Sequence, residues 1–159
     1  MPFSWSGAVH WSSTATQTVS AAALSALLMT SAMTHFRDPG FYRQVVPDYL
    51  CRDDGAAAGE PRRARPLAVM TREEWIALSG LAVAGAAVGL LIPPTRRATA
   101  TGAAALFVVF LAGHVDAIRR AYGPEGSPTQ RKVHTARLPL QVPLILWAWS
   151  LRNAGRRGS

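Results

Sequence analysis

The sequence predicts an all-α membrane protein, built as a bundle of four transmembrane helices. Charged residues make up only 16% of the 159-residue chain, and they gather between long uncharged runs. Three of these runs have about the 20 apolar residues with which a helix crosses a bilayer. Arginines stand beside the runs, as loop charges flank a membrane. We therefore expect a single membrane domain over residues 15–153, between tails at residues 1–14 and 154–159.

The chain is strongly basic, with 17 Lys and Arg against 9 Asp and Glu and a net charge of +8. Nucleic-acid-binding domains gather such charge on one patch or stripe. Here the arginines flank apolar segments, so we expect the lipid bilayer as partner and no nucleic acid. A soluble basic binding protein is the alternative, and it would appear in the cytosolic fraction. The single cysteine, Cys51, excludes an internal disulfide.

The first helix is predicted over residues 15–36, which contain no Asp, Glu, Lys or Arg. A cleaved signal peptide is the competing interpretation. No Lys or Arg precedes the run, so the basic n-region of a signal peptide is missing, and we favour a retained helix. Pro39 and Pro47 then prevent simple continuation of the helix. The mixed aromatic and charged residues up to Leu50 favour a segment that lies along the lipid headgroups.

The second and third helices are predicted over residues 73–92 and 97–118. Pro93 and Pro94 end the second helix, and only a few residues separate it from the third. This short connection predicts an antiparallel hairpin. Gly85 and Gly89 are four residues apart, a spacing that allows close contact with another helix.

The fourth helix is predicted over residues 135–153. Its uncharged part, from Leu138 to Leu151, is shorter than a full span. Extension to the full length includes Arg137 and Arg152, whose long side chains can reach the headgroups. Trp147 and Trp149 suit the aromatic belt of a membrane interface.

The two long connections are predicted to share one side of the membrane. Residues 52–66 are expected to form a flexible loop, and residues 119–136 a polar, turn-rich loop. Twelve of the seventeen basic residues fall in the first and third connections. The positive-inside rule then places both connections in the cytoplasm and both termini outside.

Four polar residues near or within the predicted spans form a candidate polar site: His35, His114, Arg137 and Gln141. An ionisable residue at membrane depth is a functional candidate by default. Arg137 and Gln141 share a helix face through their i, i+4 spacing, and a glutamine in a span prefers the bundle interior. For His35 the alternatives are a helix-end imidazole facing carbonyls, or a ligand or proton carrier acting with His114.

Asp116 follows His114 by two residues and therefore faces another direction on the helix. It is spaced to pair with Arg120 at i+4, as an ion pair at the membrane interface. No His or Cys spacing resembles a zinc site, so we predict no metal. No Ser-His-Asp triad, phosphate loop or pair of catalytic carboxylates is recognisable, and an enzyme is not expected.

Several short motifs occur in order along the chain. The first helix ends in His-Phe, followed by Pro, an aromatic pair and Val-Pro. The second opens with Ser-Gly and closes with Leu-Leu-x-Pro before arginines, and the fourth opens with Arg-Leu-Pro-x-Gln and ends in a Trp-rich stretch. The residues concerned are His35, Phe36, Pro39, Phe41, Tyr42, Val46, Pro47, Ser79, Gly80, Leu90, Leu91, Pro93, Arg96, Arg97, Arg137, Leu138, Pro139, Gln141, Trp147 and Trp149. With this order and spacing, the chain resembles the DoxX-like family of small four-helix bacterial membrane proteins.

The resemblance implies a multi-pass protein of the bacterial cytoplasmic (inner) membrane. It also implies an accessory or interaction subunit of a quinone-linked redox system, with membrane oxidoreductase subunits as partners. The alternative is a quinone-binding or small-molecule carrier protein that uses a polar site inside the bundle, with quinone as the one cofactor in view. The chain departs from the family pattern at Val83, where relatives commonly carry Glu, and at Cys51, where proline is common. A role of that glutamate cannot be carried over.

Overall fold

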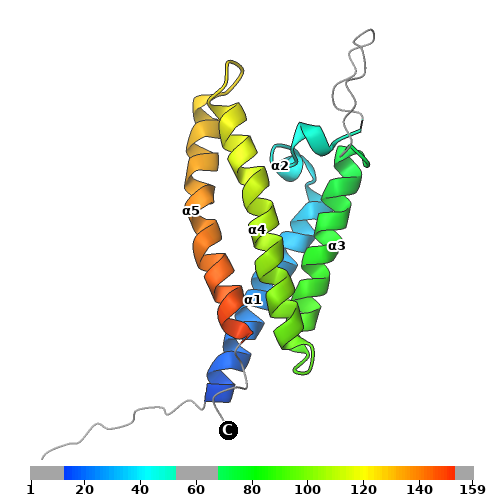
Figure 1. Cartoon of the computed structure of the whole chain (residues 1–159), viewed down its shortest axis with the longest axis vertical. Helices are drawn as coiled ribbons and strands as arrows, with labels where there is room; N and C mark the ends of the chain where they lie inside the picture. Colours follow the sequence, from blue (N-terminus) through cyan, green and yellow to red (C-terminus); the bar gives the residue numbers. More distant parts are fainter. Residues whose placement is uncertain (1–12, 53–67, 153–159) are drawn as a thin grey trace, which may run out of the picture.

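The computed structural model describes residues 13–52 and 68–152, and helices make up most of them (Figure 1). Four of these helices are long. They are α1 (Ser13–Arg37), α3 (Arg72–Leu91), α4 (Arg96–Ala121) and α5 (Pro128–Leu151). The short helix α2 (Gly40–Arg43) and the 3-10 helix η1 (Asp48–Leu50) lie between α1 and α3. The predicted all-α class is confirmed, whereas the predicted tails and flexible loop lie almost entirely outside the described residues.

The long helices run alternately up and down in Figure 1, in the order α1, α3, α4 and α5. Two antiparallel pairs pack most extensively, α1 with α3 and α4 with α5. The α3–α4 hairpin joins the pairs. The end of the bundle that carries Arg37, α2, Arg72, Ala121 and Pro128 is called the α2 end below, and the opposite end is called the hairpin end.

Among the described residues, three helices are long and apolar enough to cross a membrane: α1, α3 and α4. Their outward side chains are apolar, and Leu81 and Val109 are 62% and 66% exposed. A surface of this kind suits lipid, which indicates a multi-pass membrane protein associated with the bilayer. The helix α5 is not among them, and it carries Arg131, Lys132 and Arg137 in its first half.

The observed ends of α1, α3 and α4 lie within three residues of their predicted positions. The fourth helix differs, because α5 begins at Pro128, seven residues before its predicted start. Ser127 caps it: the Ser127 hydroxyl accepts from the backbone N–H of Gln130, whose side chain accepts from the Ser127 N–H. This capping box and the proline at the first helical position start the helix within the predicted loop, which was therefore drawn too long.

The apolar core occupies the half of the bundle nearest the hairpin end. Its buried residues come from all four long helices: Ala21, Leu24, Leu28, Ala32, Val83, Ala87, Leu90, Ala100, Ala103, Ala104, Phe107, Ala148 and Leu151. Trp147 also turns inward, and its indole Nε1 donates to Ser20 Oγ at 2.8 Å. Of the two tryptophans expected in an interfacial belt, Trp147 therefore ties α5 to α1, and Trp149 is the exposed one. Towards the α2 end, α4 and α5 bury only small or polar residues, among them Ala117 and Gln141.

The close helix contact of α3 is made by Gly80. A Cβ atom on Gly80 would lie 2.8 Å from the Cβ of His35, so α1 and α3 cross there with little space between them. Of the Gly85 and Gly89 pair, Gly89 also approaches another helix closely, because a Cβ atom there would lie 2.5 Å from Thr99 Oγ1 of α4. A Cβ on Gly85 would meet nothing within 4 Å. The face of α3 that is turned towards the core carries Val83 and the residues about one turn from it, Gly80 and Ala87.

Candidate functional site

The segment of residues 38–51, called the fold-back segment here, returns over the α2 end of the bundle. Pro47 is buried. The carbonyl oxygen of Val45 lies so close to Gly113 of α4 that a Cβ atom at Gly113 would collide with it. The end of the segment is held beside the start of α3, where the Arg52 N–H donates to the Met70 carbonyl at 2.9 Å. The segment therefore packs onto the helices and does not simply lie along the headgroups as expected.

Two arginines from different helices hold the fold-back segment. Arg72 Nη2 and Arg120 Nη1 both donate to Asp48 Oδ1, each at 2.6 Å. Arg72 Nη1 also donates to the Val46 carbonyl at 2.8 Å, and Arg120 Nη2 to the Gln44 carbonyl at 2.7 Å. Backbone carbonyls outside regular helices need such donors when packing against protein removes them from water. The arginines at the start of α3 and the end of α4 thus replace water as partners of this segment.

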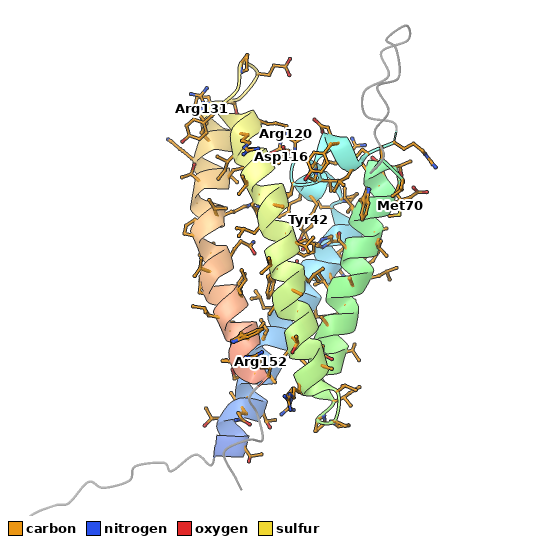
Figure 2. All side chains as sticks on the ribbon, viewed as in Figure 1. Tyr42, Met70, Asp116, Arg120, Arg131 and Arg152 are labelled. Carbon is orange, nitrogen blue, oxygen red and sulfur yellow. The ribbon has the colours of Figure 1, made fainter. Side chains whose placement is uncertain are left out.

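The predicted pair of Asp116 and Arg120 is present, with 3.2 Å between Asp116 Oδ2 and Arg120 Nη2 (Figure 2). Arg120 therefore bridges Asp116 on its own helix and Asp48 on the fold-back segment. Burial acts to raise the pKa of Asp48, but the hydrogen bonds and positive charges of Arg72 and Arg120 outweigh it. The pKa of Asp48 is accordingly lowered below its ordinary value, and the carboxylate is ionised at neutral pH.

His35 is buried and packs against the fold-back segment. Its ring stacks on Tyr42 with 3.6 Å between the ring centroids, and its Nδ1 lies 2.8 Å from the Ser31 carbonyl. The Tyr42 hydroxyl lies 3.1 Å from Ser31 Oγ. Since the carbonyl can only accept, Nδ1 carries the hydrogen and donates. His35 thus fixes α2 against the end of α1, as a helix-end imidazole that faces a carbonyl.

Phe41 connects this stack to α5. Its ring meets Tyr42 edge to face with 5.1 Å between centroids, and the guanidinium of Arg137 lies 4.1 Å from its centroid. The cation thus lies over an aromatic face, which attracts it electrostatically. Two of the predicted site residues, His35 and Arg137, are joined in this way through two aromatic rings and without direct contact.

The facing surfaces of α4 and α5 contain buried polar atoms that lack partners. Four such side-chain atoms occur among the described residues, and three of them are His114 Nδ1, His134 Nδ1 and Gln141 Oε1. Arg137 and His134 also lie in the neighbourhood of His114. A buried polar atom without a hydrogen bond costs roughly 1–3 kcal/mol, so three of them near one another are unusual in a packed interior.

The register of the helix pair brings His114 and Gln141 to one level, and His134 lies seven residues, about two turns, nearer the α2 end. Near the α2 end, Arg131 Nε donates to the Ala121 carbonyl at 2.9 Å, and the Tyr122 and Thr135 hydroxyls are 3.5 Å apart. Because α4 and α5 are antiparallel, each residue further down α4 from these contacts corresponds to one residue further along α5. By this count, His114 lies opposite a residue of α5 between 138 and 143. Gln141 lies inside that interval. The α4–α5 site is defined here as His114, His134, Arg137 and Gln141.

His134 is 3% exposed and forms one hydrogen bond, from Nε2 to Gln44 Oε1 at 3.0 Å. The carboxamide oxygen only accepts, so Nε2 donates and Nδ1 of the neutral ring is an acceptor. In this tautomer the buried Nδ1 has no partner among the described residues and is available as an acceptor to a bound molecule.

An open cleft of about 800 Å³ lies beside this site at the α2 end. Its walls come from the fold-back segment, the start of α3, the end of α4 and the start of α5. His134 lines it, and so do four arginines, Arg43, Arg72, Arg119 and Arg120. The cleft provides a route by which a molecule can reach His134.

The family model described as "Domain of unknown function (DUF8561)" matches residues 24–152. The chain belongs to this family. The DUF8561 match includes every residue of the α4–α5 site and most of α1. No curated protein and no solved structure matches the chain.

In this DUF8561 chain, three of the four predicted site residues belong to the α4–α5 site: His114, Arg137 and Gln141. His35 lies apart from them in the Tyr42 stack. Sequence reasoning missed His134 and its partner Gln44. His134 precedes Gln141 by seven residues, a spacing that places two buried residues on one helix face. This signal becomes visible only if the helix starts at Pro128 and not at residue 135.

Proposed function

We propose that this DUF8561 chain is a multi-pass protein of the bacterial cytoplasmic membrane that binds a small membrane-soluble molecule of the quinol class at the α4–α5 site. The setting in a bacterial redox system rests on the resemblance to DoxX-like proteins. The binding role rests on one observation: three buried polar atoms without partners lie on the facing surfaces of two helices.

Support for a fourth span comes from the outer face of α5. Leu140, Val142 and Leu146 are 59%, 56% and 61% exposed, and all three belong to the second half of the helix. Exposed apolar side chains on one stretch suit lipid contact. The first half carries the basic residues, which can reach the headgroup level at the α2 end. With this helix included, the bundle has four spans, and the positive-inside rule places the α2 end in the cytoplasm.

The chemistry of the unpartnered atoms selects the ligand class. His134 Nδ1 and Gln141 Oε1 are acceptors, so a molecule that satisfies them must donate hydrogen bonds. The two hydroxyl groups of a quinol are such donors, and its ring and tail are soluble in the bilayer. The oxidised quinone offers only carbonyl oxygens, which accept. The site is therefore expected to prefer the reduced form.

Titration of the purified protein in mild detergent with a short-chain quinol tests this proposal. Binding to the native state raises the midpoint of thermal unfolding. We expect a quinol-dependent rise for the wild type and none for Gln141→Leu or His134→Phe. Gln17→Leu, which makes the same chemical change in α1, should retain the rise. A wild type that does not respond, or four proteins that respond equally, would refute the proposal.

The redox setting has a separate test. As an accessory subunit of a quinone-linked system, the chain should co-purify with an oxidoreductase from bacterial membranes in mild detergent. Isolation of the chain alone, under conditions that preserve other membrane complexes, would count against the accessory role. It would leave the quinol titration as the measure of the binding role.

A further inference from the structure

We propose that a second site, on the outer face of α4, binds an anionic phospholipid. Its phosphate lies at Arg119, and one acyl chain lies in a groove along the helix. This site differs from the α4–α5 site and goes beyond the proposed function.

The groove measures about 410 Å³ and is open. It is lined by apolar residues of α4 and by Tyr49 of the fold-back segment: Tyr49, Val108, Leu111, Ala112 and Val115. Relative to Val108, the other α4 residues follow at i+3, i+4 and i+7, so they form one stripe on the helix face. Asp116 and Arg119 line the end of the groove nearest the α2 end. The groove is therefore apolar along its length and charged at the level where headgroups lie.

Arg119 belongs to both hollows, because it also lines the arginine-rich cleft at the α2 end. Within the described residues it forms no hydrogen bond or ion pair of its own. Its neighbours do form them: Arg43 pairs with Glu73, and Arg120 with Asp48 and Asp116. Asp116, the acidic residue of the groove, thus has a cationic partner. The guanidinium of Arg119 remains available for an anion, and a guanidinium binds phosphate oxygens in a bidentate manner.

The groove distinguishes a phospholipid from a free phosphate ion. A soluble anion that binds Arg119 would not contact the stripe of valine, leucine and alanine, which begins one turn below Arg119. A phospholipid has the charged head and the apolar chain in the same order as Arg119 and the groove. In the proposed orientation the α2 end faces the cytoplasmic leaflet, where anionic lipids attract basic side chains.

Native mass spectrometry of the full chain can measure this binding. The protein is released from detergent in the presence of phosphatidylglycerol or of phosphatidylcholine with the same acyl chains. We expect phosphatidylglycerol to be retained preferentially by the wild type. Arg119→Gln should lower the bound fraction about fivefold, which corresponds to the roughly 1 kcal/mol of one basic residue at an anionic membrane surface. Arg97→Gln, the same charge change at the hairpin end, should have no effect.

The groove has its own variant. Ala112→Phe should fill the groove and reduce phosphatidylglycerol binding while Arg119 remains, whereas Val109→Phe on the adjacent exposed position should not. Arg119→Lys keeps the charge and should restore much of the binding lost in Arg119→Gln, which separates loss of the site from loss of the fold.

Three outcomes would overturn the proposal. Equal losses in Arg119→Gln and Arg97→Gln would indicate unspecific charge attraction. Unchanged binding in Ala112→Phe would exclude the groove. If inorganic phosphate at matched ionic strength stabilises the wild type and not Arg119→Gln, and phosphatidylglycerol has no advantage over phosphatidylcholine, the ligand is a soluble phosphate.

Discussion

The imidazole of His35 stacks on the phenol ring of Tyr42, with 3.6 Å between centroids and 20° between the ring planes. This contact joins the end of a predicted membrane helix to a segment that folds back over the bundle. It gives His35 a structural role that leaves the α4–α5 site to His114, His134, Arg137 and Gln141.

The stack predicts a graded response to changes at Tyr42. Tyr42→Phe keeps the ring and removes the hydroxyl contact with Ser31, which should cost about 1 kcal/mol. Tyr42→Leu should cost about a further 0.5–1.5 kcal/mol, because the ring pair is lost as well. Reversible unfolding in detergent micelles can measure both values. Equal stability of the two variants would show that the ring pair contributes nothing.

Replacement of helix glycines by alanine should lower the stability at some positions and raise it at another. At Gly80 and Gly113 a Cβ atom would collide with His35 and with the Val45 carbonyl, so Gly80→Ala and Gly113→Ala should each cost about 1–3 kcal/mol. At Gly102 a Cβ would meet nothing within 4 Å, and Gly102→Ala should stabilise the helix by up to about 1 kcal/mol. The same unfolding measurement applies. Loss of stability in Gly102→Ala similar to that in Gly113→Ala would contradict the assigned contacts.

The lowered pKa of Asp48 predicts a pH dependence of stability. The folded state holds the proton of Asp48 less tightly than the unfolded chain, in which the pKa is about 3.9. Its contribution is therefore fully present above that pH and is lost as the pH falls through the lower pKa of the folded state. Asp48→Asn should be less stable than the wild type at pH 6, and the difference should shrink at pH 3. A constant difference across this range would show that the ion pairs with Arg72 and Arg120 do not act.

Replacement of Gln141 should raise the stability of the protein and remove its response to quinol. Its buried Oε1 lacks a hydrogen bond within the described residues, so Gln141→Leu removes an uncompensated polar atom. We expect Gln141→Leu to be about 1 kcal/mol more stable than the wild type without ligand, and to lose the stabilisation by quinol. Thermal unfolding with and without quinol tests both halves. A destabilised Gln141→Leu would indicate that the carboxamide already has a partner.

Membrane orientation can be tested with single cysteines. In a Cys51→Ser background, Glu125→Cys lies at the α2 end, and Thr95→Cys lies in the α3–α4 turn. A membrane-impermeant maleimide applied to intact cells, with the outer membrane made permeable, should label the Thr95→Cys variant and spare the Glu125→Cys variant. The reverse pattern would show that the arginine-rich end faces outside.

Much of the fold could be predicted from uncharged runs. Helices α1, α3 and α4 bury or expose apolar side chains almost throughout, so the limits of the runs nearly coincide with the limits of the helices. The start of α5 was missed because Arg131 and Lys132 resemble loop residues when charge alone is considered. The Ser127–Gln130 capping box was the local signal that could have corrected it.

The candidate site depended on tertiary contacts that no local pattern contains. Arg137 and Gln141 could be found because a shared helix face follows from spacing alone. The return of the fold-back segment could not be found, since it depends on Arg72 and Arg120, which are 48 residues apart in sequence and meet at Asp48. The contact of Gln44 with His134 is of the same kind and spans 90 residues.

Identification of the small molecules that accompany the protein out of its native membrane tests the central claim most directly. The chain is purified from bacterial cells in mild detergent, extracted with organic solvent, and the extract is analysed by mass spectrometry. We predict a quinol or its oxidation product near stoichiometric amount with the wild type and Gln17→Leu, and its loss from His134→Phe and Gln141→Leu. Wild-type and Gln141→Leu extracts with the same quinone content, or a wild-type extract without any, would contradict binding at the α4–α5 site.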